Sequence, residues 1–147
     1  MSALLGRAFL QARFRFRPVV CSVTRAFVSS SDAPDHVVTY SQMKKMLATR
    51  NIQLLDVRNP DEFQAGKIPH AVNVPLDSLE ESLQLSPEQF LQRFGVRAPL
   101  RGDDNLVFQC RSGRRSLEAL DIARHLGFSK ARHYEGGYKE WVELDGE

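Results

Sequence analysis

The sequence has little cysteine, no long apolar run and, over residues 1–31, no acidic residue. Its only cysteines are Cys21 and Cys110, in a chain of 147 residues. This number excludes a framework of several disulfides and a zinc site built from cysteines. The apolar runs fall far short of the roughly 20 residues needed to cross a bilayer, so we expect no membrane-spanning helix.

The segment without acidic residues carries five arginines and several serines. Leu5, Phe9 and Phe16 recur in it at helical spacing, which makes its start amphipathic. An amphipathic, Arg-rich and acid-free N-terminus is typical of a mitochondrial transit peptide, although a disordered basic tail is an alternative. We therefore expect residues 1–31 to be a disordered transit peptide directing the protein to the mitochondrial matrix, and residues 32–147 to form one domain.

Beyond this leader the charge balance is slightly acidic. The remaining 15 lysines and arginines stand against all 18 acidic residues of the chain. The predicted domain therefore lacks the basic character of a nucleic-acid-binding protein. The overall composition, 42% hydrophobic and 26% charged, is typical of a globular domain with a buried core.

The most informative stretch runs from Leu106 to Leu117, LVFQCRSGRRSL. It begins with an apolar run typical of a buried strand and continues into helical spacing, which predicts a helix over 116–126. Cys110 therefore lies between a strand and the start of a helix. Unpaired N–H groups at a helix N-terminus, together with nearby arginines, stabilise an anion such as a thiolate. The pattern favours a reactive cysteine over a buried structural one.

The loop from Cys110 to Arg115 contains the other predicted site residues. Gly113 lets the loop turn with its amides pointing inward. Helix starts favour acidic residues, so Arg114 and Arg115 in this place are interpreted as ligand-binding rather than as a solvated surface. Arg115 is the weaker candidate of the two, because it is nearer the helix and its side chain can belong to the helix surface instead of the ligand site. The predicted substrate-binding residues are Arg111, Ser112, Gly113, Arg114, Arg115 and Arg58.

Strands and helices alternate along the rest of the chain. Strands are predicted near 37–40, 52–57, 71–74 and 131–134, and helices near 41–49, 60–65, 76–83, 86–94 and around Trp141. This alternation indicates an α/β fold with a parallel sheet, in which ligands bind at the carboxyl ends of the strands. Cys110 lies at one such end, and Asp56 and Arg58 lie at another.

Three blocks in order, LLDVRNPDEFQAGKIPHAVNVP, CRSGRRS and GFSKARHYEGGYKEW, resemble the rhodanese family, in particular its small single-domain members that follow a transit peptide. The resemblance covers about residues 36–145. It implies a rhodanese-like fold, with a five-stranded parallel sheet and helices on both faces. It also implies a sulfurtransferase that passes sulfane sulfur from a donor such as thiosulfate or a persulfide to a thiol or other nucleophile through a Cys110 persulfide.

The same resemblance assigns further residues. Asp56 and Arg58 occupy the family's Asp-x-Arg positions, where we expect Asp56 to give structural support and Arg58 also to contact the ligand. The sequence departs from the family at Lys67, where histidine is usual, and at His70, where a small residue, often glycine, is usual. We interpret Lys67 as a surface change and His70 as a partly exposed loop histidine rather than a proton donor.

Two other functions are open at this stage. Cysteine phosphatases and arsenate reductases use a similar loop, but they need an arginine six positions after the cysteine, where this chain has Ser116. A non-catalytic interaction or sulfur-sensing module of the same fold would typically lack the cysteine. We expect a monomer without cofactor or metal, acting on small sulfur-containing anions, with glutathione or an acceptor protein among its partners. The sequence does not identify the donor or the acceptor.

Overall fold

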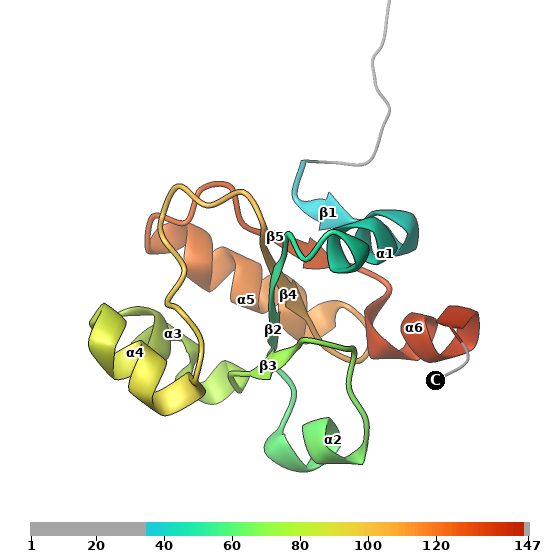
Figure 1. The fold of residues 1–147 in the computed structure, drawn as a ribbon, viewed down its shortest axis with the longest axis horizontal. Helices are drawn as coiled ribbons and strands as arrows, with labels where there is room; N and C mark the ends of the chain where they lie inside the picture. Colours follow the sequence, from blue (N-terminus) through green and yellow to red (C-terminus); the bar gives the residue numbers. More distant parts are fainter. Residues whose placement is uncertain (1–34, 146–147) are drawn as a thin grey trace, which may run out of the picture. The chain divides into compact units, whose positions relative to one another are not determined.

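The structure, a computed structural model, describes residues 35–145, so the expected transit peptide lies outside the described residues. Five strands form one parallel sheet in the order β1-β5-β4-β2-β3 (Figure 1). The strands are β1 (Val37–Val38), β2 (Gln53–Asp56), β3 (Val72–Asn73), β4 (Leu106–Gln109) and β5 (Arg132–Tyr134). The α-helices are α1 (Tyr40–Ala48), α2 (Pro60–Ala65), α3 (Leu79–Leu83), α4 (Pro87–Phe94), α5 (Arg114–His125) and α6 (Gly137–Asp145), and a 3-10 turn, η3 (Leu76–Ser78), precedes α3. The expected fold class is confirmed.

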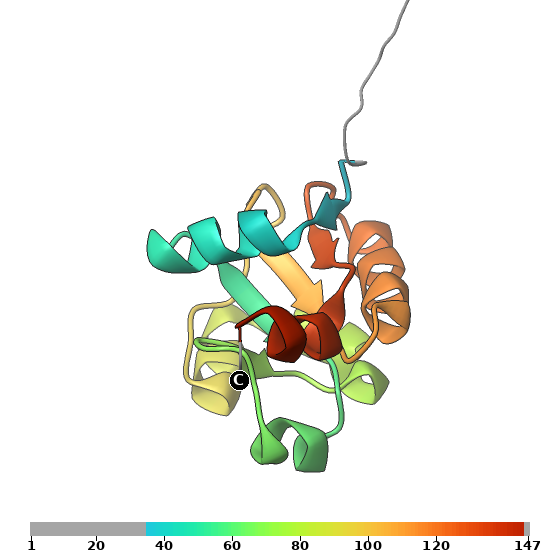
Figure 2. The same ribbon diagram turned by 90° about the vertical axis from the view of Figure 1, so that its right-hand side faces the viewer.

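The central strands are apolar on both faces because helices cover both sides of the sheet. Leu55 and Phe108 point into one hydrophobic cluster, and their neighbours Leu54 and Val107 point into the other, as the two-residue period of a strand requires. Residues of α3 and α5 complete the first cluster, and residues of α1 and α6 complete the second. Figure 1 shows the sheet nearly edge-on between these two sets of helices, and Figure 2 shows α1 and α6 in front of it. Among the described residues no helix combines the length and apolarity needed to span a membrane.

The first helix begins earlier than the sequence indicated. Thr39 caps it: the Thr39 hydroxyl accepts a hydrogen bond from the Gln42 amide, and the Gln42 side chain accepts one from the Thr39 amide. This reciprocal capping box satisfies two amides at once and so favours a helix start at Tyr40. The first strand is correspondingly shorter and ends at Val38.

The helix after the cysteine also begins early, at Arg114 instead of residue 116. Gly113 forms its N-cap with a φ of 93°, a left-handed conformation that glycine adopts without steric cost. Arg114 and Arg115 therefore form the first turn of α5. Their side chains therefore project from a helix and not from a loop.

His70 has a φ of 69°, in the left-handed region that glycine adopts freely. This conformation explains why the resembled family often has glycine at this position. The side chain is exposed and lines a small cavity with Ile52 and Leu106, which lie at or just before the amino ends of β2 and β4. Since Cys110 lies at the carboxyl end of β4, His70 is at the opposite edge of the sheet from the cysteine.

Candidate active site

Cys110 directly follows β4, the middle strand of the sheet, and three residues separate it from the start of α5. Its residue exposure is 1%, and it is the only cysteine within residues 35–145. The position is the one that strand–loop–helix units use for anions, because strand end and helix start converge on it. A buried cysteine in a wholly apolar setting would be inert, so the polar groups around its sulfur decide its chemistry.

Two backbone amides hold the sulfur. The Gly113 N–H donates to Cys110 Sγ at 3.1 Å and the Ser116 N–H donates at 3.3 Å. These are the N-cap and third-position amides of α5, which have no partner within the helix. Both amides and the positive end of the helix dipole stabilise a negative sulfur. Within the described residues these are the hydrogen bonds to Cys110 Sγ. The second donor, Ser116, lies outside the predicted loop of residues 110–115.

Ser116 also ties the loop to the sheet. Its hydroxyl donates to the Gly113 carbonyl at 3.1 Å and lies 2.9 Å from Nδ1 of His133, on the adjacent strand β5. His133 is buried and its ring stacks on that of His36, with centroids 6.0 Å apart. Burial lowers the pKa of His133, with a further contribution from His36, which favours the neutral ring. From the sequence we used Ser116 only to argue against a phosphatase. Its contacts with the Gly113 carbonyl and with His133 could not be predicted there.

The other side of the loop is held by the start of α6. The Tyr138 N–H donates to the Cys110 carbonyl at 2.7 Å, and the Lys139 N–H donates to the Arg111 carbonyl at 3.0 Å. This close approach requires glycine at position 137, because a Cβ there would lie 2.3 Å from the Arg111 carbonyl oxygen. The C-terminal GGYKEW motif is thus part of the support of the cysteine loop.

Asp56 and Arg58 form a buried ion pair beside the loop. Arg58 Nη2 lies 2.7 Å from Asp56 Oδ2, and Arg58 Nε lies 3.0 Å from both carboxylate oxygens. The same Nη2 donates to the Gly66 carbonyl at 2.7 Å, and the guanidinium lies 4.5 Å from the centre of the Tyr138 ring. With exposures of 0% and 3%, these two side chains stabilise each other mainly by satisfying one another's hydrogen bonds. Arg58 also lines a cleft between α2 and α6.

The three arginines of the loop have two different environments. Arg115 forms a two-pronged ion pair with Glu62 of α2, with N–O distances of 2.8 and 3.1 Å. Arg111 and Arg114 are exposed, and neither forms an ion pair with a described residue. The predicted residue Ser112 is exposed as well. Among the described residues the charges of Arg111 and Arg114 therefore have no carboxylate partner, whereas Arg115 is paired with Glu62.

The Glu62–Arg115 pair joins α2 to the start of α5. The hydrogen bond from Arg115 is the largest cause that lowers the pKa of Glu62, to about 2, and the Asn59 amide and the charges of Arg115 and Arg58 add to it. Glu62 is therefore ionised throughout the neutral range. No pattern in the sequence indicates this pair, because Glu62 and Arg115 are 53 positions apart in the chain.

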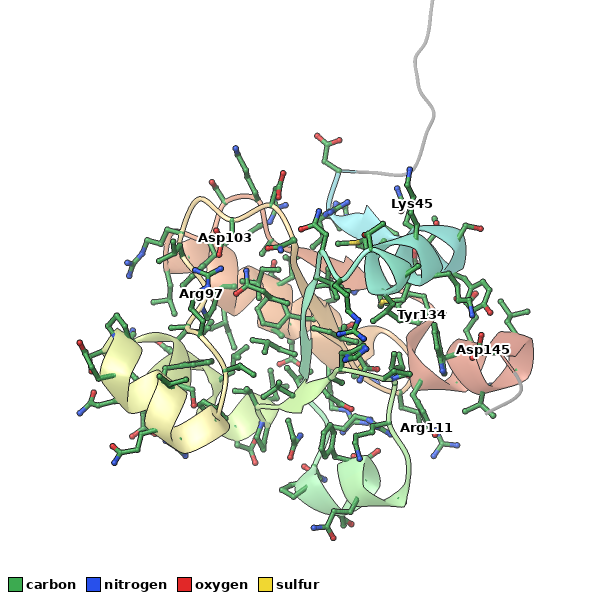
Figure 3. All side chains as sticks on the ribbon, viewed as in Figure 1. Lys45, Arg97, Asp103, Arg111, Tyr134 and Asp145 are labelled. Carbon is green, nitrogen blue, oxygen red and sulfur yellow. The ribbon has the colours of Figure 1, made fainter. Side chains whose placement is uncertain are left out.

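The cleft between α2 and α6 has a volume of about 460 Å³ and lies next to the loop. Six of the residues that line it are polar or aromatic: Arg58, Glu62, Arg111, Tyr138, Lys139 and Glu143. Figure 3 shows Arg111 between α2 and α6. Residues 35–145 contain no cluster of histidine, cysteine and carboxylate side chains able to hold a metal ion. The arrangement suits a thiolate that reacts with a small anion at the mouth of an amide-lined loop.

Comparisons with known proteins agree with this geometry. The chain matches the model of the rhodanese-like domain over residues 39–144. It is 46% identical over 109 residues to mouse "Thiosulfate sulfurtransferase/rhodanese-like domain-containing protein 3", covering 74% of this chain and 69% of that protein. It is 41% identical over 108 residues to human "Thiosulfate:glutathione sulfurtransferase", covering 74% and 94%.

A budding-yeast relative, "Thiosulfate sulfurtransferase RDL2, mitochondrial", is 30% identical over 112 residues, which is 75% of this chain and 74% of that protein. The solved structure of the human single-domain sulfurtransferase TSTD1 superposes with a TM-score of 0.72 at 39% identity, covering 74% of this chain and 96% of that one. The family model spans nearly all of residues 35–145, and the relatives are similar over most of their own length. The chain belongs to the rhodanese family.

Proposed function

We propose that the protein is a sulfurtransferase that moves the outer sulfur of thiosulfate to glutathione through a persulfide on Cys110. The observation that carries this proposal is the position of Cys110 Sγ, held by the Gly113 and Ser116 amides at the start of α5. Two relatives named above act, by their names, on thiosulfate and on glutathione. Sulfurtransferase activity fits a site that has an anion-stabilising loop and, within residues 35–145, no side-chain base hydrogen-bonded to the sulfur.

The reaction has two displacements. In the first, the Cys110 thiolate attacks the outer sulfur of thiosulfate, the S–S bond of thiosulfate breaks, and sulfite leaves with the electron pair. In the second, the glutathione thiolate attacks the outer sulfur of the persulfide, and the Cys110 thiolate leaves and is regenerated. Each step exchanges one S–S bond for another, so the cycle needs no external oxidant or reductant.

Within this mechanism the residues have distinct roles. The Gly113 and Ser116 amides stabilise the negative sulfur before the first step and after the second. Arg111 and Arg114 attract the anionic donor, and Asp56 and Arg58 hold the neighbouring strand end. Arg115 acts through Glu62, by fixing α2 against α5.

The function is tested by the intact mass of the purified protein. Thiosulfate is expected to add the mass of one sulfur atom and to release one sulfite per protein, and glutathione or cyanide is expected to remove that sulfur. Aryl phosphates are expected not to be hydrolysed, because residue 116 is serine and not the arginine of a phosphate-binding loop. A protein that takes up no sulfur from thiosulfate or any persulfide would be a non-catalytic module of this fold, and phosphatase turnover would favour the rival enzyme class.

The exposed Arg114 and the paired Arg115 are expected to differ when replaced. Arg114→Gln should raise the KM for thiosulfate by less than about fivefold, and added salt should erase the difference, because the side chain is in water. Arg115→Gln should also lower the free energy of unfolding, by about 0.5–1 kcal/mol, because it breaks the pair with Glu62. Donor kinetics across a salt series and urea melts of both variants measure these effects. Equal KM values and equal unfolding free energies for the two variants would contradict the different roles assigned to Arg114 and Arg115.

We further propose that the protein is mitochondrial and reaches the matrix after loss of most of residues 1–31. The support is the Arg-rich, acid-free leader and the mitochondrial relative. N-terminal sequencing of protein from isolated mitochondria is expected to find a start between about Phe27 and Ser31. An intact Met1 on cytosolic protein would argue against import.

A further inference from the structure

The cleft between α2 and α6 is larger than the proposed donor needs. Its volume of about 460 Å³ lies within the roughly 300–1,000 Å³ of small-molecule sites, whereas thiosulfate has only five non-hydrogen atoms. Arg111 belongs both to the cleft wall and to the cysteine loop, and its Cα is about 3.8 Å from that of Cys110 across one peptide bond. A ligand lying over Arg111 is therefore next to the loop that carries the reacting sulfur.

Arg58 and Glu62 of the cleft are already paired with Asp56 and Arg115. The other charged side chains that line the cleft form a basic and an acidic group. Arg111 and Lys139 stand on segments locked together by the hydrogen bond from the Lys139 amide to the Arg111 carbonyl. Neither forms an ion pair with a described residue, so both are available to a carboxylate. Glu143 lies one turn further along α6 and is exposed. Its carboxylate forms no ion pair with any of residues 35–145.

The remaining wall of the cleft is partly apolar. The Tyr138 ring lies on the Arg58 guanidinium, 4.5 Å from its centre, and packs against Gly66, where a Cβ would meet the phenol oxygen. Ala65 and Val142 add aliphatic surface. A small ligand with carboxylates and an ammonium group matches the charges of this surface.

We propose that this cleft is the binding site of the sulfur acceptor, a small peptide thiol with the charges of glutathione. Arg111 and Lys139 bind its carboxylates, and Glu143 binds its ammonium group. This inference rests on the proposed function and adds to it where the acceptor lies and what selects it. The bound thiolate then attacks the outer persulfide sulfur, the bond from that sulfur to Cys110 Sγ breaks, and the acceptor leaves as a persulfide while Cys110 regains its thiolate.

The test compares Lys139→Glu with the control Lys130→Glu. Lys130 is also an exposed lysine, but it precedes β5 at the amino edge of the sheet. Lys139→Glu is expected to raise the KM for glutathione about tenfold and the KM for the uncharged 2-mercaptoethanol by less than about twofold, since only glutathione carries carboxylates. Lys130→Glu should keep the parent values for both thiols.

A second variant tests the ammonium contact. Glu143→Gln is expected to raise the KM for glutathione about threefold, and to leave or lower the KM for 3-mercaptopropionate, which has a carboxylate but no amine. Equal changes for charged and uncharged thiols, or no change for any thiol, would overturn the assignment of the cleft.

Binding without turnover separates this inference from the proposed function. Calorimetry with S-methylglutathione, which cannot accept sulfur, is expected to show binding to the parent and about tenfold weaker binding to Lys139→Glu. Absence of binding to the parent would overturn the cleft assignment even if thiosulfate loads Cys110 normally. Binding with the expected loss in Lys139→Glu would support the cleft even if thiosulfate fails to load the cysteine, a result that would remove the proposed donor alone.

Discussion

Replacing Cys110 with serine is expected to abolish sulfur transfer, with a loss of at least about a thousandfold in turnover. The serine hydroxyl is not ionised at neutral pH and cannot form a persulfide. The fold should persist, because the serine oxygen can still accept from the Gly113 and Ser116 amides that now hold the sulfur. Sulfite release and intact mass after thiosulfate treatment measure the loss, and circular dichroism checks the fold.

The other cysteine of the chain is the matched control. Cys21 lies within the expected leader, so Cys21→Ser should load and discharge sulfur at the parent rate. Turnover in a folded Cys110→Ser protein, or loss of activity in Cys21→Ser, would remove Cys110 from its assigned role. Since residues 35–145 contain no other thiol, no described residue could substitute for it as a sulfur carrier.

Replacing Gly113 with alanine is expected to reduce both stability and activity. The φ of 93° disfavours any side chain, and a Cβ at this position would lie 2.3 Å from the backbone oxygen of Glu135. Because that obstacle is backbone, the loop itself must shift, at a cost of about 2 kcal/mol or more in the free energy of unfolding. The shift moves the Gly113 amide away from Cys110 Sγ, and loss of one such donor typically reduces turnover about a hundredfold.

Two other glycines separate the causes. Gly95 has a φ of 76°, but a Cβ at this position would meet no atom within 4 Å, so Gly95→Ala measures backbone strain alone. Gly102 has neither a positive φ nor a close neighbour, so Gly102→Ala should be nearly neutral. Urea melts should therefore rank the loss of stability as Gly113→Ala, then Gly95→Ala, then Gly102→Ala, with only the first slow in sulfur transfer. A Gly113→Ala protein with parent activity would show that its amide does not support the sulfur.

Much of the fold and the place of the proposed nucleophile, Cys110, could be predicted from the sequence, because both depend on local patterns. The apolar run from Leu106 to Phe108 marks a strand buried on both faces, and the spacing after Arg115 marks a helix. The order of these two elements places Cys110 between the end of a strand and the start of a helix, and this placement does not depend on how the rest of the chain folds. The family resemblance then supplied the number of strands and the persulfide chemistry.

The partners of the site residues depended on the tertiary structure, because each joins segments far apart in the chain. Arg115 is bound to Glu62 rather than to a ligand only because α2 lies beside the start of α5. Ser116 meets His133 because β5 pairs with β4 in one particular register. Such contacts depend on which surfaces pack together, which sequence periodicity does not specify.

The cleft shows the same division. The sequence by itself predicts that Cys110 carries the chemistry and shows that arginines surround it, since position and charge are read directly from neighbouring residues. Only the packing of α6 on the cysteine loop brought Lys139 and Glu143 beside Arg111. The physical reason is that reactivity follows from the local field at a helix start, whereas a binding surface needs side chains from several elements at fixed distances.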